Sequence, residues 1–278
     1  MQHRRAFLRR CGAVVLVATG GMVAGSLAGC TGGRDDALSN LPATTGSSTR
    51  LIQGAQQQVA GSGTVATWAR VDRNDVVVEV GATIPLALAQ NLSNLQPGTG
   101  PSGALVSLPF PAQVRSSTFF NHFQAQAAPE GHPPLSRFGV AHFDFHFYAV
   151  PEEQVRQVTG LDPTPPAPER VPAGYTYPGA EQTVPEMGVH ALADAEFAPG
   201  AAPFSATMVL GYYRGQMTFL EPMVTQALLL QRQSFTLPVP LPPVLGRSTR
   251  YPTRFTATFV AESNTYQFVF SDFVSVTQ

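Results

Sequence analysis

A seven-residue stretch, HFDFHFY at 142–148, alternates side chains able to bind a metal or move a proton with aromatic side chains. A period of two is typical of a β-strand and would place His142, Asp144 and His146 on one face. The phenylalanines would be buried on the other face, each contributing about 2 to 3 kcal/mol. Two imidazoles and a carboxylate on one face, without charge partners nearby in the sequence, indicate metal ligation or an imidazole oriented by an acid.

Strand geometry limits how this face could bind an ion. A strand rises about 3.3 Å per residue, so the backbones of His142 and His146 should lie about 13 Å apart. Metal–nitrogen bonds are only about 2.1 Å long, so both rings can hardly reach one ion from a flat strand. Either the strand bulges, or Asp144 pairs with one histidine, or Asp144 supports a ring from outside the ligand shell.

Further ligands must come from other segments. His190 follows Gly188, which permits a close backbone approach, and Glu221 ends an apolar run before Pro222. His132 lies in the rigid GHPP turn at 131–134. We predict a divalent site for zinc or another first-row ion, because nitrogen and carboxylate ligands suit these metals. The predicted ligands are His142, His146, His190 and Glu221, with Asp144 and His132 as supporting or additional groups.

Other residue patterns narrow the function without fixing it. The sequence has no Gly-rich phosphate loop, no GxSxG and no HExxH motif, which removes several enzyme classes. Its two cysteines, Cys11 and Cys30, lie near the start, so the body has no cysteine ligand or internal disulfide. A lone histidine such as His122 is expected to be structural, and Phe119, Phe120 and Phe123 are expected in the core.

Three interpretations of the predicted site stay open. The first is a non-catalytic protein that binds an ion or small ligand with four protein ligands. The second is a metal-dependent enzyme, a hydrolase or cupin-like oxygenase, with three ligands, a metal-bound water, and Asp144 or Glu221 as base. The third is a histidine network that holds no metal. Neither the catalytic residues nor the substrate is defined by the sequence.

The four motifs resemble those of a family of uncharacterised exported bacterial proteins. Its members share GHxPP, HFDFHFY, MGxH and FxEPM, and this chain has GHPP at 131–134, HFDFHFY at 142–148, MGVH at 187–190 and FLEPM at 219–223. The resemblance implies an all-β body and directs attention to the same histidines and Glu221, but it brings no settled activity. A looser similarity to the cupins is architectural, because the HxDxH spacing and the order of ligands differ from theirs.

The first thirty residues have the three parts of an export signal. Basic residues precede an apolar run that is too short and too rich in glycine to span a bilayer. Arg4 and Arg5 begin RRAFLR, which resembles the twin-arginine consensus. Leu27 to Cys30, LAGC, resembles a lipobox in which the Cys30 thiol accepts a lipid. We expect a signal peptide at 1–29 and a protein lipid-anchored to the cell envelope, on its periplasmic or extracellular face.

The remaining chain is predicted to form one folded body. Residues 30–50 are rich in Gly, Ser and Thr, which is typical of a flexible tether, and 51–278 should form a single β-rich domain. A composition of 44% hydrophobic and 13% charged residues, with 25 Pro and 25 Gly, suits a compact body with many turns. Net charge is −1 and no basic cluster follows the signal, so nucleic acid is not expected as a partner. A small-molecule ligand and a homo-oligomer are left open.

Short β-rich runs separated by turn residues predict a β-sandwich or barrel-like domain with one or two short helices and long Pro/Gly-rich loops. A hairpin is expected around 262–264, and residues 161–185 should form an ordered surface loop. The predicted strands are 64–71, 76–81, 104–108, 118–124, 140–150, 205–213, 216–221, 253–261 and 265–274, and the predicted helices are 152–159 and 222–232.

Overall fold

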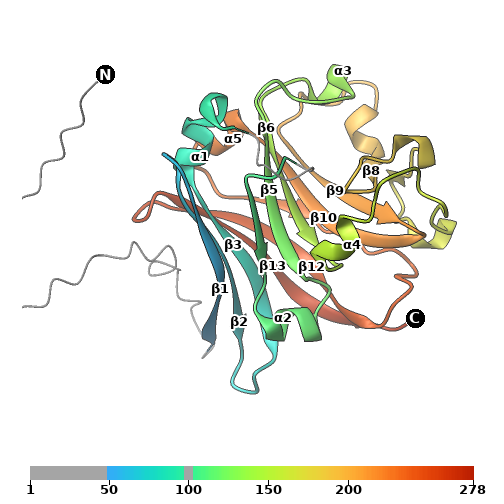
Figure 1. The fold of residues 1–278 in the computed structure, drawn as a ribbon, viewed down its shortest axis with the longest axis horizontal. Helices are drawn as coiled ribbons and strands as arrows, with labels where there is room; N and C mark the ends of the chain where they lie inside the picture. Colours follow the sequence, from blue (N-terminus) through green and yellow to red (C-terminus); the bar gives the residue numbers. More distant parts are fainter. Residues whose placement is uncertain (1–48, 97–102) are drawn as a thin grey trace, which may run out of the picture. The chain divides into compact units, whose positions relative to one another are not determined.

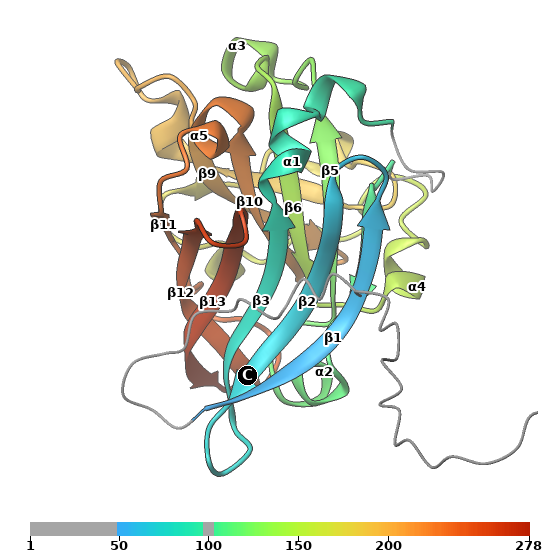
Figure 2. The ribbon, with the colours of Figure 1, turned by 90° about the vertical axis from the view of Figure 1, so that its left-hand side faces the viewer.

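The computed structural model describes residues 49–96 and 103–278. The predicted signal peptide, Cys30 and most of the predicted tether lie outside these residues. The described chain forms two antiparallel sheets of six and seven strands, and they do not close into a barrel. Figures 1 and 2 show the two sheets as layers of a β-sandwich, which confirms the predicted fold class.

The two sheets use different parts of the chain. In the first sheet, the order is β1 (Arg50–Val59), β2 (Gly63–Val71), β3 (Val77–Pro85), β13 (Thr265–Val276), β12 (Thr249–Val260) and β11 (Phe235–Pro238). In the second, it is β4 (Val106–Pro109), β5 (His122–Ala128), β6 (His142–Tyr148), β10 (Gln216–Thr225), β9 (Ala206–Tyr213), β8 (Val189–Ala193) and β7 (Tyr175–Thr176). The strand that contains HFDFHFY therefore lies inside the second sheet, between β5 and β10.

Aromatic side chains fill the space between the sheets. Phe145 and Phe147 of β6 lie 4.8 Å, ring centroid to ring centroid, from Phe268 and Phe270 of β13. All four rings are fully buried in one large cluster. Offset or edge-on aromatic pairs contribute about 0.5–1.5 kcal/mol beyond the burial of their surface. The odd-numbered positions of β6 thus hold the two sheets together, as the alternation predicts.

The opposite face of the second sheet is also covered, but by loops. All seven residues of β6 are buried. Phe138 and Phe204, from segments outside the sheet, pack with Val209 and Met223 on this face. Figure 1 shows the segment between β6 and β9, in yellow-green to yellow-orange, on the side away from β1, β2 and β3. The even-numbered side chains of β6 consequently lie beneath a loop layer rather than in solvent.

Short helices connect the strands. The α-helices are α1 (Leu86–Gln90), α2 (Ala112–Ser117), α3 (Leu135–Phe138), α4 (Glu152–Val155) and α5 (Gln226–Leu230), and 3-10 turns occur at Leu92–Asn94, Pro168–Arg170, Ala180–Gln182 and Asp194–Phe197. The predicted helix at 222–232 is wrong in its first residues, because β10 continues to Thr225. The Thr225 hydroxyl then accepts a hydrogen bond from Leu228 N and caps α5.

Most predicted strands occur, with shifted ends. The strand expected at 118–124 begins only at His122, because α2 ends at Ser117 and the chain bends over residues 118–121 before it enters β5. The first strand, β1, begins at Arg50 and was not predicted, and neither were β7, β8 and β11. The hairpin around 262–264 is confirmed, since Val260 pairs with Thr265 across that turn.

Candidate metal centre

Histidines and carboxylates form two separate clusters over the second sheet. We call His146, His190 and Glu221 the His146 cluster, and His132, His142 and Asp144 the His142 cluster. In each cluster, one candidate ligand atom from every residue lies within 4.8 Å of the others. Among the described residues, these clusters could hold a metal ion.

Strand pairing brings the His146 cluster together. Leu220 pairs with Phe147 and Met223 with Asp144, so this register places Glu221 across from His146. His190 comes from β8, which is separated from β10 by β9. Its side chain is 20% exposed, whereas those of His146 and Glu221 are 1% and 2% exposed.

The spacing in the His146 cluster suits a shared ion. Nε2 of His146 lies 3.6 Å from Oε1 of Glu221, and Nε2 of His190 lies 3.6 Å from Oε2. Two ligand atoms bound to one ion at about 2.1 Å, at the tetrahedral angle, are about 3.4 Å apart. Both ring nitrogens of His146 and Oε2 of Glu221 have no hydrogen-bond partner within the described chain. Buried polar atoms normally have partners, so these atoms favour a bound cation.

Burial in the His146 cluster keeps its imidazoles neutral, which is the form that binds a metal ion. Burial, followed by the proximity of His190, lowers the pKa of His146 to about 3. Burial lowers the pKa of His190 to about 4. Both rings therefore keep a lone pair at neutral pH. Burial and then the charge of Asp144 raise the pKa of Glu221 well above its ordinary value. A cation beside Glu221 would offset the cost of burying its charged form.

An aromatic ring forms the floor of the His146 cluster. The Phe219 ring centroid lies 4.8 Å from that of His146 and 5.2 Å from that of His190. Gly211 of β9 lies next to Phe219 in the register and next to His190 on the other side. A Cβ at Gly211 would lie only 2.1 Å from the Phe219 ring, so the missing side chain makes room for this floor.

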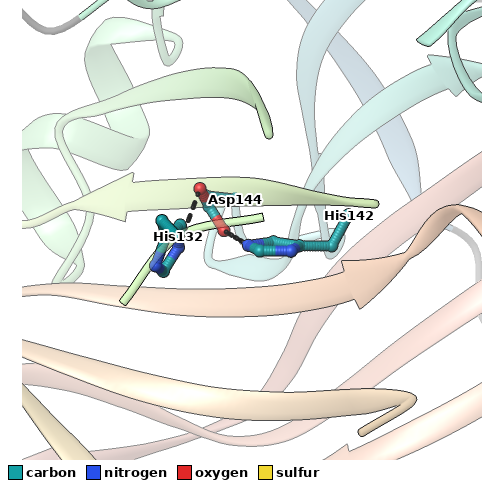
Figure 3. A group of neighbouring side chains, drawn as sticks. All are labelled: His132, His142 and Asp144. Atoms are coloured by element: carbon teal, nitrogen blue, oxygen red, sulfur yellow. Dashed lines mark ion pairs between the residues drawn. The ribbon is translucent and has the colours of Figure 1, made fainter. Parts of the chain in front are cut away.

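The His142 cluster has one carboxylate between two imidazoles (Figure 3). Oδ1 of Asp144 lies 3.2 Å from Nε2 of His142, and Oδ2 lies 3.5 Å from Nε2 of His132. His142 is fully buried, whereas the His132 side chain is 40% exposed. Burial alone would raise the pKa of Asp144, but its interactions with the two histidines outweigh burial and lower it. Burial likewise opposes the effect of Asp144 on His132, whose pKa is raised.

Both clusters border one cavity of about 660 Å³. This volume lies within the range of small-molecule sites, about 300–1,000 Å³. His132, Asp144, His146, His190 and Glu221 line it. The remaining lining is mostly apolar and includes Pro133, Pro134, Phe138, Pro178, Val184, Met187, Leu192 and Met223, with the amides of Gln126 and Gln182.

The structure divides the predicted ligand set. His146, His190 and Glu221 lie together, but His142 does not join them and belongs with Asp144 and His132. The reason is the distance between His142 and His146 along a regular strand. β6 has an unbroken register with β5 from His142 to Tyr148 and does not bulge. Asp144 pairs with histidines, which was one of the alternatives.

Several residues at the site were not predicted. Gln126 lies across from Asp144 in β5, lines the cavity and is 8% exposed. The alternation of Gln124 and Gln126 with alanines in β5 was the available signal. Phe219 and Gly211 had no comparable signal, because their roles depend on packing. His122 lies outside both clusters, and its ring stacks on that of Tyr148 at 4.5 Å.

Comparisons with known proteins found no relative of this chain. No protein-family model matches the chain, and no curated protein or solved structure matches it either. The similarity to exported bacterial proteins through the four motifs stays a prediction.

Proposed function

We propose that this protein binds a divalent first-row metal ion, such as zinc, through His146, His190 and Glu221, and is a metal-dependent enzyme. One observation carries the proposal: three candidate ligands converge on the wall of a cavity of about 660 Å³. Catalytic zinc sites usually have three protein ligands and an open position for water, whereas structural sites have four. Two histidines and a glutamate are a donor set of hydrolytic zinc enzymes.

The lining of the cavity favours a neutral substrate. Apart from the two clusters, the described lining residues are apolar or amides. No arginine is among them, so within this lining only the histidines or a bound cation could supply positive charge to an anionic group. We infer a small, largely apolar molecule whose ester or amide carbonyl reaches the ion, and hydrolysis as the reaction.

Metal analysis tests the site directly. Untagged protein should bind zinc or cobalt(II). His146→Ala and His190→Ala should each weaken binding at this cluster by about 100-fold or more, because loss of a residue that only hydrogen-bonds to a ligand already lowers metal affinity by about 10- to 100-fold. His122→Phe is the matched control, since it removes a buried imidazole of the same sheet and keeps a ring against Tyr148. If both cluster variants keep the full metal load, the site is wrong.

A second measurement separates an enzyme-type site from a closed one. Cobalt(II) in an open three-ligand site should change its visible spectrum when azide or acetohydroxamate is added, because these ligands occupy the free position. A spectrum that neither compound alters would favour the non-catalytic alternative. A protein that binds no metal would favour the histidine network.

The proposal also includes export and lipid anchoring. Its support is the sequence of the first thirty residues, with the RRAFLR and LAGC motifs. Across the ranges that the structure describes, no helix has the length and apolar character needed to cross a bilayer.

A further inference from the structure

The His142 cluster is not used by the proposed function, although two of its residues, His132 and Asp144, border the same cavity. His132 comes from the turn at 131–134, and His142 and Asp144 come from β6. Figure 3 shows the carboxylate between the two rings. Nε2 of His142 and Oδ1 of Asp144 are 3.2 Å apart, yet neither has a hydrogen-bond partner within the described residues.

In both rings, the contact made by Nδ1 fixes the tautomer, and therefore whether Nε2 carries a proton where it faces the carboxylate. Nδ1 of His142 lies 2.7 Å from the carbonyl oxygen of Val140, and Nδ1 of His132 lies 3.0 Å from that of Pro133. A carbonyl oxygen only accepts, so each Nδ1 must be the protonated donor. In a neutral ring, Nε2 then presents a lone pair, and in both rings it faces a carboxylate oxygen, which is also an acceptor.

These facing acceptors favour a cation bound between them. One proton would satisfy a single contact and leave the other ring facing the carboxylate with a lone pair. Protons on both rings would bring together two charged imidazoles whose centroids are 4.7 Å apart. One divalent ion would satisfy both contacts, and the N–O distances of 3.2 and 3.5 Å bracket the spacing of about 3.4 Å between ligands on one tetrahedral ion. Histidine ligands almost always donate their other N–H to a carbonyl or carboxylate, as both rings do here.

From this geometry we infer a second divalent metal site, formed by His132, His142 and Asp144. It extends the proposed function, since both ions would border one cavity. Asp144 and His146 are two residues apart on one face of β6, so their backbones lie about 7 Å apart. Two ions bound by neighbouring positions of this face could hold two oxygen donors of one substrate, such as two carbonyl groups.

The surroundings keep His132 in place. Gly131 has a φ of 69°, and a Cβ there would lie 2.2 Å from the carbonyl oxygen of Phe138. His132 N donates to that same carbonyl. Arg137 Nε donates to Glu196 at 2.8 Å, which ties α3 to the segment after β8. The turn is therefore held partly by its own backbone, and its order does not rest on the contact with Asp144 alone.

Metal stoichiometry tests the second site separately from the first. The full chain, stripped with a chelator and titrated with zinc in a metal buffer, should bind two ions. His132→Gln should weaken one of them by about 100-fold or more and leave the other unchanged, and Asp144→Asn should weaken the same ion by about 100-fold or more. His132 is the safest variant for folding because its side chain is 40% exposed. Near-UV circular dichroism of each variant checks that the fold is kept.

Each outcome bears on one site or the other. A single ion that is lost in His146→Ala but kept in His132→Gln and Asp144→Asn would overturn the second site and leave the proposed function standing. A single ion with the reverse pattern would support the second site and overturn the proposed one. Two ions that both persist in His132→Gln and Asp144→Asn would place the second ion elsewhere and overturn the inference.

Discussion

Replacing Gly211 with alanine tests whether the ring floor under the His146 cluster matters for metal binding. The new Cβ would lie 2.1 to 2.3 Å from three atoms of the Phe219 ring. Carbon atoms in contact are usually about 3.5–4.0 Å apart, so the ring must retreat by more than one ångström. Overpacking of this kind costs about 1–3 kcal/mol of unfolding free energy. Because the ring packs on His146 and His190, its displacement should also weaken zinc binding by about 10- to 100-fold.

The assay for Gly211→Ala combines urea unfolding of the metal-free protein with a zinc competition titration. Gly160→Ala is the matched control, since no atom lies within 4 Å of the Cβ it would add. This control should change unfolding by no more than about 0.5 kcal/mol and leave zinc affinity unchanged. Wild-type zinc affinity in folded Gly211→Ala protein would refute the role given to the Phe219 ring.

Three further predictions concern acid stability, metal removal and export. Burial lowers the pKa of His122 to about 4, so the unfolded chain takes up a proton below about pH 6.5 that the folded chain refuses. His122→Phe should therefore lose about 2–3 kcal/mol less stability than wild type between pH 7.5 and 4.5 in urea unfolding, and equal losses would contradict this reasoning. At free zinc of 100 times Kd, each bound ion should stabilise the fold by about 2.7 kcal/mol over chelator-treated protein in thermal melts. Glu221→Gln should lose the contribution of the His146 cluster, and a zinc-dependent stabilisation equal to that of wild type would count against Glu221 as a ligand. Cys30→Ser should abolish labelling with a fatty-acid probe, and continued labelling would disprove the lipobox.

The sequence predicted the local pattern of the site better than its grouping. Alternation in 142–148 correctly placed the phenylalanines toward the core and the polar side chains on the other face, because a side-chain period of two leaves no alternative in a regular strand. The same geometry indicated that His142 and His146 could not share an ion easily. Which distant residues join each of them depends on strand pairing, and the sequence contains no direct record of that pairing.

Strands outside the alternating pattern were harder to predict. β1, with RLIQGAQQQV, has few apolar residues and lies at the edge of its sheet, where half-exposed positions need no regular alternation. β7 is only two residues long, and β11 is four. The sequence predicted a helix from Pro222, but this proline lies in β10, where its missing N–H falls between Leu220 and Met223, a point at which the pairing of β10 with β6 is interrupted.

Each cluster links a peripheral segment to the central strands of the second sheet. In each cluster, side chains of β6 or β10 meet a histidine from a peripheral segment: His190 from β8, and His132 from the turn at 131–134. The peripheral histidine is the more exposed member in both, at 20% and 40% of its side chain. An ion in the His142 cluster would therefore join the loop layer to the second sheet, and an ion in the His146 cluster would join β8, near the edge of that sheet, to its central strands. The other face of the sheet is already fixed by the phenylalanine core. Since the strand side is rigid, loss of metal should loosen the peripheral segments first and leave the sandwich intact.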